Sequence, residues 1–143
     1  MCRQIAFSGP EMVAIAAPYV GIPFAHQGRD GRGMDCYGLF LAIMHDMGRT
    51  LPDFDYIADW EKAGGNVLME NYWKYGEEIQ KADLAPGDAI LFKNSPVINH
   101  IAVFLGGGRF VHATKAGVAI CSFDRQPYSR MAAMYCRLKD ATN

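Results

Sequence analysis

Residues 35–48 read DCYGLFLAIMHDMG, and this stretch sets the arrangement expected for the rest of the chain. Apolar residues follow Cys36 at intervals of 3, 4, 7, 8 and 11 positions, which is the spacing of one face of an α-helix. The stretch ends in Gly48, a residue type that is common just after a helix. The pattern predicts a helix that begins at or near Cys36, with the thiol on its buried face.

The segment before this helix combines a helix start with a loop. Ser8 and Glu11 have the spacing of a capping box, so a helix is expected after Ser8, and Pro18 should end or kink it early. Residues 21–33 contain four glycines and a proline, which is loop composition. A short helix and an irregular loop should therefore precede the central helix.

The final third of the chain changes to short, apolar segments rich in β-forming residues. They are residues 88–92, 100–105, 109–113, 117–121 and 134–138. The three glycines at 106–108 predict a hairpin between the second and third of these. Helices followed by an antiparallel sheet describe an α+β domain, and the length of 143 residues predicts a single domain over 1–143.

The middle segment, residues 49–83, is interpreted as an insertion that flanks a cleft. It contains a candidate helix over 66–78 with aromatic residues at 72, 73 and 75. Such residues can bind sugar or peptide, but an aromatic stripe at helical spacing is more often part of a core. We therefore interpret these aromatic residues as part of a core.

Composition excludes several classes of partner. With 14 Lys and Arg against 15 Asp and Glu, the formal charge is -1, so no net field attracts nucleic acid or an anionic membrane. No apolar stretch reaches the roughly 20 residues of a membrane span, and residues 1–11 show no cleavable signal peptide. The expected protein is made in the cytoplasm without membrane insertion, and its cysteines at 2, 36, 121 and 136 are expected to be free thiols.

Cys36 is the candidate nucleophile, because a helix N-terminus and a nearby imidazole both lower the pKa of a thiol. Among the four histidines, His45 should point away from the thiol, and His26 could line a pocket or merely bond to backbone. His100 is the best candidate base because it begins a core strand. His112 follows on the next strand, so the two could be neighbours and form a triad with Cys36.

A metal site is the alternative use of the same side chains. Cys36, His100 and His112 are acceptable zinc ligands, but the sequence offers no fourth candidate at close spacing. The plainer alternative is that both histidines are hydrogen-bonded within the sheet and that Cys36 is a buried structural thiol. The nucleophile interpretation is favoured, and no metal or other cofactor is expected.

Several blocks, in the same order along the chain, resemble the NlpC family of papain-like cysteine peptidases. Asp35-Cys36-Tyr37-Gly38-Leu39 resembles the family's Asp-Cys-Ser-Gly-Leu motif, and Gly21-Ile22-Pro23-Phe24 resembles its Gly-Thr-Pro-Tyr element. Residues 86–92, 100–106 and 109–113 resemble the sheet that carries the base and the third catalytic residue. The chain is particularly similar to the branch found in phages and prophages.

The resemblance implies a cell-wall hydrolase that cuts stem peptides of peptidoglycan, typically between D-glutamate and diaminopimelate. It implies that Cys36 attacks, that His100 is the base and that His112 orients His100. Asp35 matches a position that helps some members receive a free amino end of the substrate. Phage tail proteins are implied partners, and the implied location is a virion or tail that acts at the cell wall.

Two residues at the substrate-binding rim depart from the family pattern. Tyr37 stands in place of Ser, and Phe24 replaces a Tyr whose hydroxyl reaches the active site; His26 is a candidate to supply the missing donor. Two other functions stay open: a catalytically silent tail-assembly module with the same fold, and a lipid acyltransferase or amidase. In the last class the histidine tends to precede the cysteine, whereas here Cys36 precedes His100, which favours the peptidase.

Overall fold

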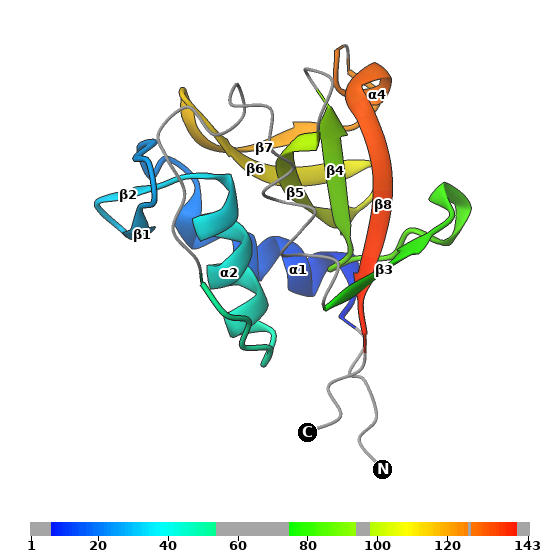
Figure 1. Cartoon of the computed structure of the whole chain (residues 1–143), viewed down its shortest axis with the longest axis horizontal. Coiled ribbons are helices and arrows are strands. Elements are labelled where there is room, and N and C mark those ends of the chain that lie inside the picture. Colours follow the sequence, from blue (N-terminus) through cyan, green and yellow to red (C-terminus); the bar gives the residue numbers. More distant parts are fainter. Residues whose placement is uncertain (1–6, 54–74, 94–97, 126, 140–143) are drawn as a thin grey trace.

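The computed structural model describes residues 7–53, 75–93, 98–125 and 127–139. Its helical elements are α1 (Gly9–Ala16), η1 (Ala17–Tyr19), α2 (Cys36–Asp46), η2 (Lys81–Asp83) and α4 (Tyr128–Met131). Its strands are β1 (Arg29–Asp30), β2 (Gly33–Met34), β3 (Gly76–Ile79), β4 (Ala89–Lys93), β5 (Ile98–Gly106), β6 (Arg109–Thr114), β7 (Gly117–Ser122) and β8 (Ala132–Leu138). The helices lead and the sheet follows, which confirms the expected α+β fold (Figure 1).

Six strands form one antiparallel sheet in the order β3-β8-β4-β5-β6-β7. The expected hairpin at 106–108 is confirmed, since it joins β5 to β6. All three of its glycines have positive φ, of 89°, 60° and 72°, a region that other residues rarely adopt. Glycine is therefore required by the turn, and the turn places the strands of His100 and His112 side by side.

The capping box at the start of α1 is present as predicted. The Ser8 hydroxyl accepts a hydrogen bond from the Glu11 N–H at 3.1 Å, and the Glu11 carboxylate accepts one from the Ser8 N–H at 2.8 Å. Pro18 lies in η1, directly after the helix, so the early end of the helix is also confirmed.

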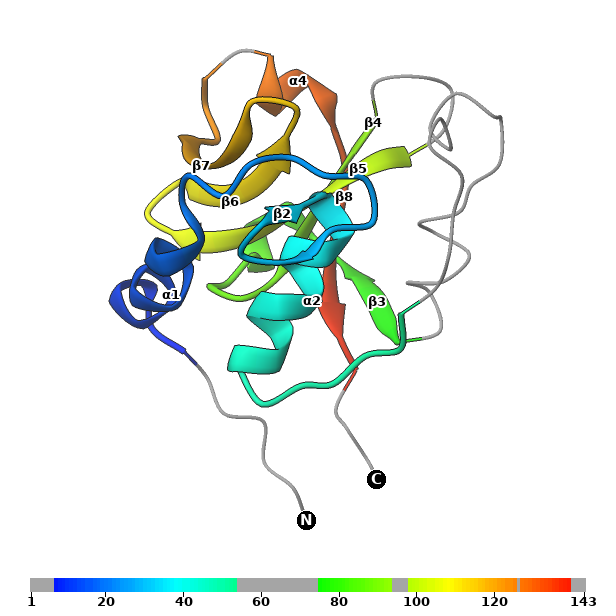
Figure 2. The ribbon, with the colours of Figure 1, turned by 90° about the vertical axis from the view of Figure 1, so that its left-hand side faces the viewer.

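The central helix α2 begins at Cys36 and packs on the sheet. Asp35 is its N-cap, and Gly48, with φ of 87°, follows its C-terminal end, as the sequence predicted. The helix contacts β5 and β6, and four of its side chains, each at most 1% exposed, belong to a core cluster shared with these strands. They are Leu39, Phe40, Ile43 and Met44. Figure 2 shows α2 in front of these strands, with α1 beside it.

Both faces of the sheet are covered by apolar side chains. One cluster joins α1 and α2 to alternate residues of β5, namely Ile101, Val103 and Leu105. A second cluster lies on the other face and includes Ile90, Phe92, Ala102, Phe110 and Phe123. The rings of His100 and His112 contact Phe92 and Phe110 of this second cluster, at centroid distances of 5.6 and 4.9 Å. The two histidines are thus surrounded by aromatic rings.

Two expectations need correction. The helix expected over 66–78 lies outside the described residues up to 74, and its last part is wrong, because Gly76–Ile79 form β3. That strand pairs with β8, whose backbone supplies the hydrogen bonds that the sequence pattern could not foresee. The expected loop 21–33 contains β1 and pairs it with β2, which adds a small two-stranded sheet. Among the described helices, none is long and apolar enough to cross a bilayer.

Candidate active site

Cys36 is the first residue of α2 and is 7% exposed. Its position agrees with the prediction from residues 35–48. A helix N-terminus carries partial positive charge from its backbone N–H groups, which favours a thiolate over a thiol. Because α2 packs on β5 and β6, the element that bears the cysteine lies against the two strands that bear the histidines.

His100 and His112 form a hydrogen-bonded pair. Val103 pairs with Val111 across β5 and β6, so the two histidines are diagonal neighbours on one face of the sheet. His100 Nε2 lies 2.9 Å from His112 Nδ1, and the rings meet edge to face with centroids 5.0 Å apart. The prediction that they are neighbours is confirmed.

Burial keeps both imidazoles neutral. Removal from water lowers the pKa of His100 to about 3, and the charge of His112 acts in the same direction. Burial alone lowers the pKa of His112 to about 4, and its side chain is 2% exposed. At neutral pH each ring therefore carries one proton, and a neutral imidazole is the form that can accept a proton from a thiol.

The second ring nitrogen of His112 contacts a residue that the sequence interpretation left out of the site. His112 Nε2 lies 3.4 Å from Cys121 Sγ. Cys121 belongs to β7 and is half-buried, and the Tyr128 ring packs edge-on against His112 with centroids 5.3 Å apart. The sequence predicts only a free thiol at Cys121, so its contact with a site residue is a finding of the structure. The short turn between β6 and β7 sets a register from which the proximity of Cys121 to His112 can be predicted.

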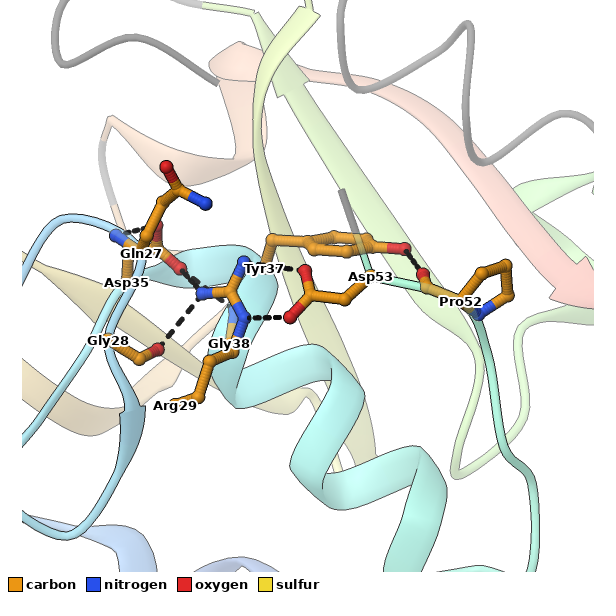
Figure 3. Close-up of polar contacts among 8 residues, drawn as sticks. All are labelled: Gln27, Gly28, Arg29, Asp35, Tyr37, Gly38, Pro52 and Asp53. Carbon is orange, nitrogen blue, oxygen red and sulfur yellow. Dashed lines mark hydrogen bonds and ion pairs between the residues drawn. The ribbon is translucent and has the colours of Figure 1, made fainter. Parts of the chain in front are cut away.

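The carboxylate of Asp35 joins the helix to the preceding loop (Figure 3). One oxygen accepts from the Gly38 N–H at 2.9 Å and from the Arg29 guanidinium at 3.0 Å. The other accepts from the Gln27 N–H at 2.9 Å. Asp35 is 5% exposed, so these donors compensate a buried charge.

Arg29 extends this network to the segment after α2. Its Nε and Nη2 atoms donate to the two carboxylate oxygens of Asp53 at 2.7 and 2.9 Å. The Tyr37 hydroxyl donates to the Pro52 carbonyl at 3.1 Å, and the Tyr37 ring is 4% exposed. Burial, and then the charge of Asp53, raise the pKa of Tyr37 to about 12. Tyr37 thus remains a neutral hydrogen-bond donor that holds the chain at Pro52.

The loop that carries Phe24 and His26 runs beside the start of α2. Phe24 forms an isolated parallel bridge with Met34, two residues before Cys36. A Cβ at Gly38 would collide with the Gly28 carbonyl, so glycine is required where the loop crosses the helix. Phe24 is half-buried here, and His26 is exposed.

The arrangement of possible metal ligands and the position of a cavity both bear on the candidate site. In residues 7–53, 75–93, 98–125 and 127–139, no group of three or more His, Cys, Asp or Glu side chains is arranged to hold a metal ion. A cavity lined by Met44, Met47, Arg49 and Arg137, among others, lies near the C-terminal end of α2. Cys36 is at the opposite end of that helix.

The sequence of the chain resembles those of known proteins. The model of the NlpC/P60 family matches residues 21–137. The gamma-D-glutamyl-L-lysine dipeptidyl-peptidase of Bacillus subtilis (strain 168) is 26% identical over 113 residues, which are 77% of this chain and 33% of that protein. The tail tip assembly protein K of Escherichia phage lambda is 35% identical over 80 residues, which are 54% of this chain and 40% of that protein.

Solved structures share the fold. A lipoprotein-like NLP/P60 family protein of Staphylococcus aureus subsp. aureus Mu50 superposes with a TM-score of 0.72 at 19% identity, over 99% of this chain and 45% of that one. The chain spans less than half the length of each of these three relatives.

Proposed function

Because the chain belongs to the NlpC/P60 family, we propose that it is a cysteine endopeptidase that hydrolyses peptidoglycan stem peptides. The proposed bond joins D-glutamate to diaminopimelate. One observation carries the proposal: Cys36 opens the helix that packs on the two strands of the hydrogen-bonded pair His100 and His112. No metal or other cofactor takes part in the proposed reaction.

The proposed reaction proceeds in two stages. His100 accepts the proton of the Cys36 thiol, and the thiolate attacks the carbonyl carbon of the scissile peptide bond. The backbone N–H of Cys36, in the first turn of α2, stabilises the oxyanion. His100 then gives its proton to the leaving amine, and water hydrolyses the thioester in the second stage.

His112 is proposed to orient His100 rather than to exchange protons with the substrate. The 2.9 Å contact occupies His100 Nε2, which leaves Nδ1 as the ring nitrogen that serves Cys36. The aromatic rings around the pair support this role, because they restrict the positions that the two imidazoles can adopt.

The substrate-binding rim is proposed to consist of Asp35, Tyr37, Phe24 and His26. An amino group of the substrate at Asp35 would share the carboxylate with the donors from Gln27, Gly38 and Arg29. The proposed recognition of a free amino end therefore requires this network to make room for a further donor. The exposure of His26 is compatible with a substrate contact.

A phage or prophage tail is the proposed setting, with tail proteins as partners and the cell wall as the site of action. The likeness to a phage tail tip assembly protein supports it. The same likeness favours the alternative function, a catalytically silent tail-assembly module that keeps the fold.

Mass spectrometry of purified stem peptides tests the enzyme. Incubation with the wild type should release a fragment that begins with diaminopimelate, and Cys36→Ala should release none. Cys136→Ala is the matched control, because it removes a buried thiol on β8 and should leave cleavage unchanged. Stem peptides that stay intact with the wild type, or that Cys36→Ala still cleaves, would contradict the proposal.

Alkylation kinetics separate the enzyme from the silent module without a substrate. Burial, followed by the charges of Glu78 and Asp88, raises the pKa of Cys136 to about 12, so this thiol should react slowly with iodoacetamide. Cys36 should react at least tenfold faster at pH 7.5. In His100→Ala its rate should fall, and equal rates for Cys36 and Cys136 would favour the silent module.

A further inference from the structure

Both ring nitrogens of His112 have partners within the described part of the chain. Nδ1 faces His100 Nε2 at 2.9 Å, and Nε2 faces Cys121 Sγ at 3.4 Å. The ring is 2% exposed, so water has little access to either nitrogen. The proton arrangement of His112 is therefore decided by a histidine on one side and a sulfur on the other.

The two histidines share one proton across their contact, and its position is coupled to the function of His100. If His100 is to accept a proton at Nδ1, its own proton must sit on Nε2 and point at the lone pair of His112 Nδ1. The proton of His112 must then sit on Nε2 and point at the Cys121 sulfur. In the opposite arrangement His112 donates from Nδ1, His100 carries its proton on Nδ1, and it presents no lone pair to a thiol.

We propose that Cys121 is a positioning residue for the proposed peptidase reaction: its sulfur accepts the Nε2–H of His112 and thereby holds His100 in the tautomer that can deprotonate Cys36. The inference rests on the proposed function. Cys121 acts through His112 and does not touch the substrate.

The register of the sheet supports this role. His112 pairs with Ala119 across β6 and β7, so Cys121 is its diagonal neighbour on the same face. Tyr128 of α4 lies beside this pair, with its ring centroid 5.3 Å from that of His112. Burial, and then the proximity of Cys121, raise the pKa of Tyr128.

Steady-state hydrolysis of purified stem peptides by position 121 variants tests the proposal. Cys121→Ala removes the acceptor and should lower kcat about fivefold with KM unchanged, which corresponds to the loss of one neutral hydrogen bond. Cys121→Ser keeps an acceptor and should retain more than half of the wild-type kcat. Cys136→Ala, the same change at a buried thiol outside the site, should match the wild type. Wild-type kcat in Cys121→Ala, or an equal loss in Cys121→Ser, overturns the role of Cys121.

Nitrogen-15 NMR of the histidine rings reads the tautomer directly and needs no substrate. At pH 7 the wild type and Cys121→Ser should show His112 protonated at Nε2, whereas Cys121→Ala should show a mixture of both tautomers. A wild-type His112 with its proton on Nδ1 overturns the inference even if stem peptides are cleaved. Stem peptides that stay intact while the tautomer is as expected overturn only the proposed function.

Discussion

Acid destabilisation through His112 is the prediction that depends most directly on the environment of the site. Burial lowers the pKa of His112 from 6.5 to about 4 in the folded protein. Below pH 6.5 the unfolded chain binds a proton that the folded protein does not yet bind. Stability is therefore fully present above pH 6.5 and is lost as the pH falls from 6.5 towards 4.

The size of the effect follows from the two pKa values. At pH 4.5 a group with pKa 6.5 in the unfolded state and about 4 in the folded state removes about 2.5 kcal/mol of unfolding free energy relative to pH 8. The near-complete burial of His112 justifies use of the whole shift. His100 is also affected, but it remains in the variant described next, so its contribution largely cancels in the comparison.

Urea unfolding at pH 8, 6.5, 5.5 and 4.5 measures this difference in wild type and His112→Gln. Glutamine cannot titrate, so the variant should lose about 2.5 kcal/mol less than the wild type over this range. His45→Gln is the control for loss of a histidine, because that side chain is exposed on α2 and lies outside the site. Parallel curves for wild type and His112→Gln would refute the view that His112 is neutral and desolvated in the folded protein.

Two further predictions concern the network at the start of α2. Arg29→Ala should lower the unfolding free energy by about 2 kcal/mol in urea denaturation, because it removes the cation beside the buried carboxylate of Asp35. The control is Arg32→Ala, which breaks an ion pair whose arginine is 92% exposed and should change the unfolding free energy by less than about 0.5 kcal/mol. Gly38→Ala should lower the melting temperature by several degrees, because its Cβ would overlap the loop backbone. Gly31→Ala places its Cβ in open space, so its melting temperature should equal that of the wild type. Equal effects within either pair would contradict the contacts described.

Much of the scaffold and the core of the candidate site follow from local patterns in the sequence. The apolar spacing after Cys36 places that residue at a helix start, and the glycine turn at 106–108 brings the strands of His100 and His112 together. Such features depend on periodicity and on the backbone freedom of glycine, which a single sequence reveals. The strands expected from the final third match β4 to β8 within two residues at each end.

The remaining parts of the site depend on long-range contacts. The bidentate pair of Arg29 and Asp53 joins two irregular segments that are 24 positions apart, and no periodicity relates them. Cys121 differs, because the two-residue turn of the β6–β7 hairpin sets a register from which its proximity to His112 can be worked out. The expectation of a free thiol at Cys121 rests on composition and compartment, so it does not include this register.

The carboxylate of Asp35 limits which substitutions can change the substrate preference of this protein. It caps the helix of Cys36, anchors the loop at Gln27 and binds Arg29, so one side chain couples the orientation of the nucleophile to the shape of the rim. A substitution that reshapes the rim through this residue would also displace the thiol. New substrate preferences should therefore arise by substitution at rim positions other than Asp35, such as the exposed His26, while Asp35 persists.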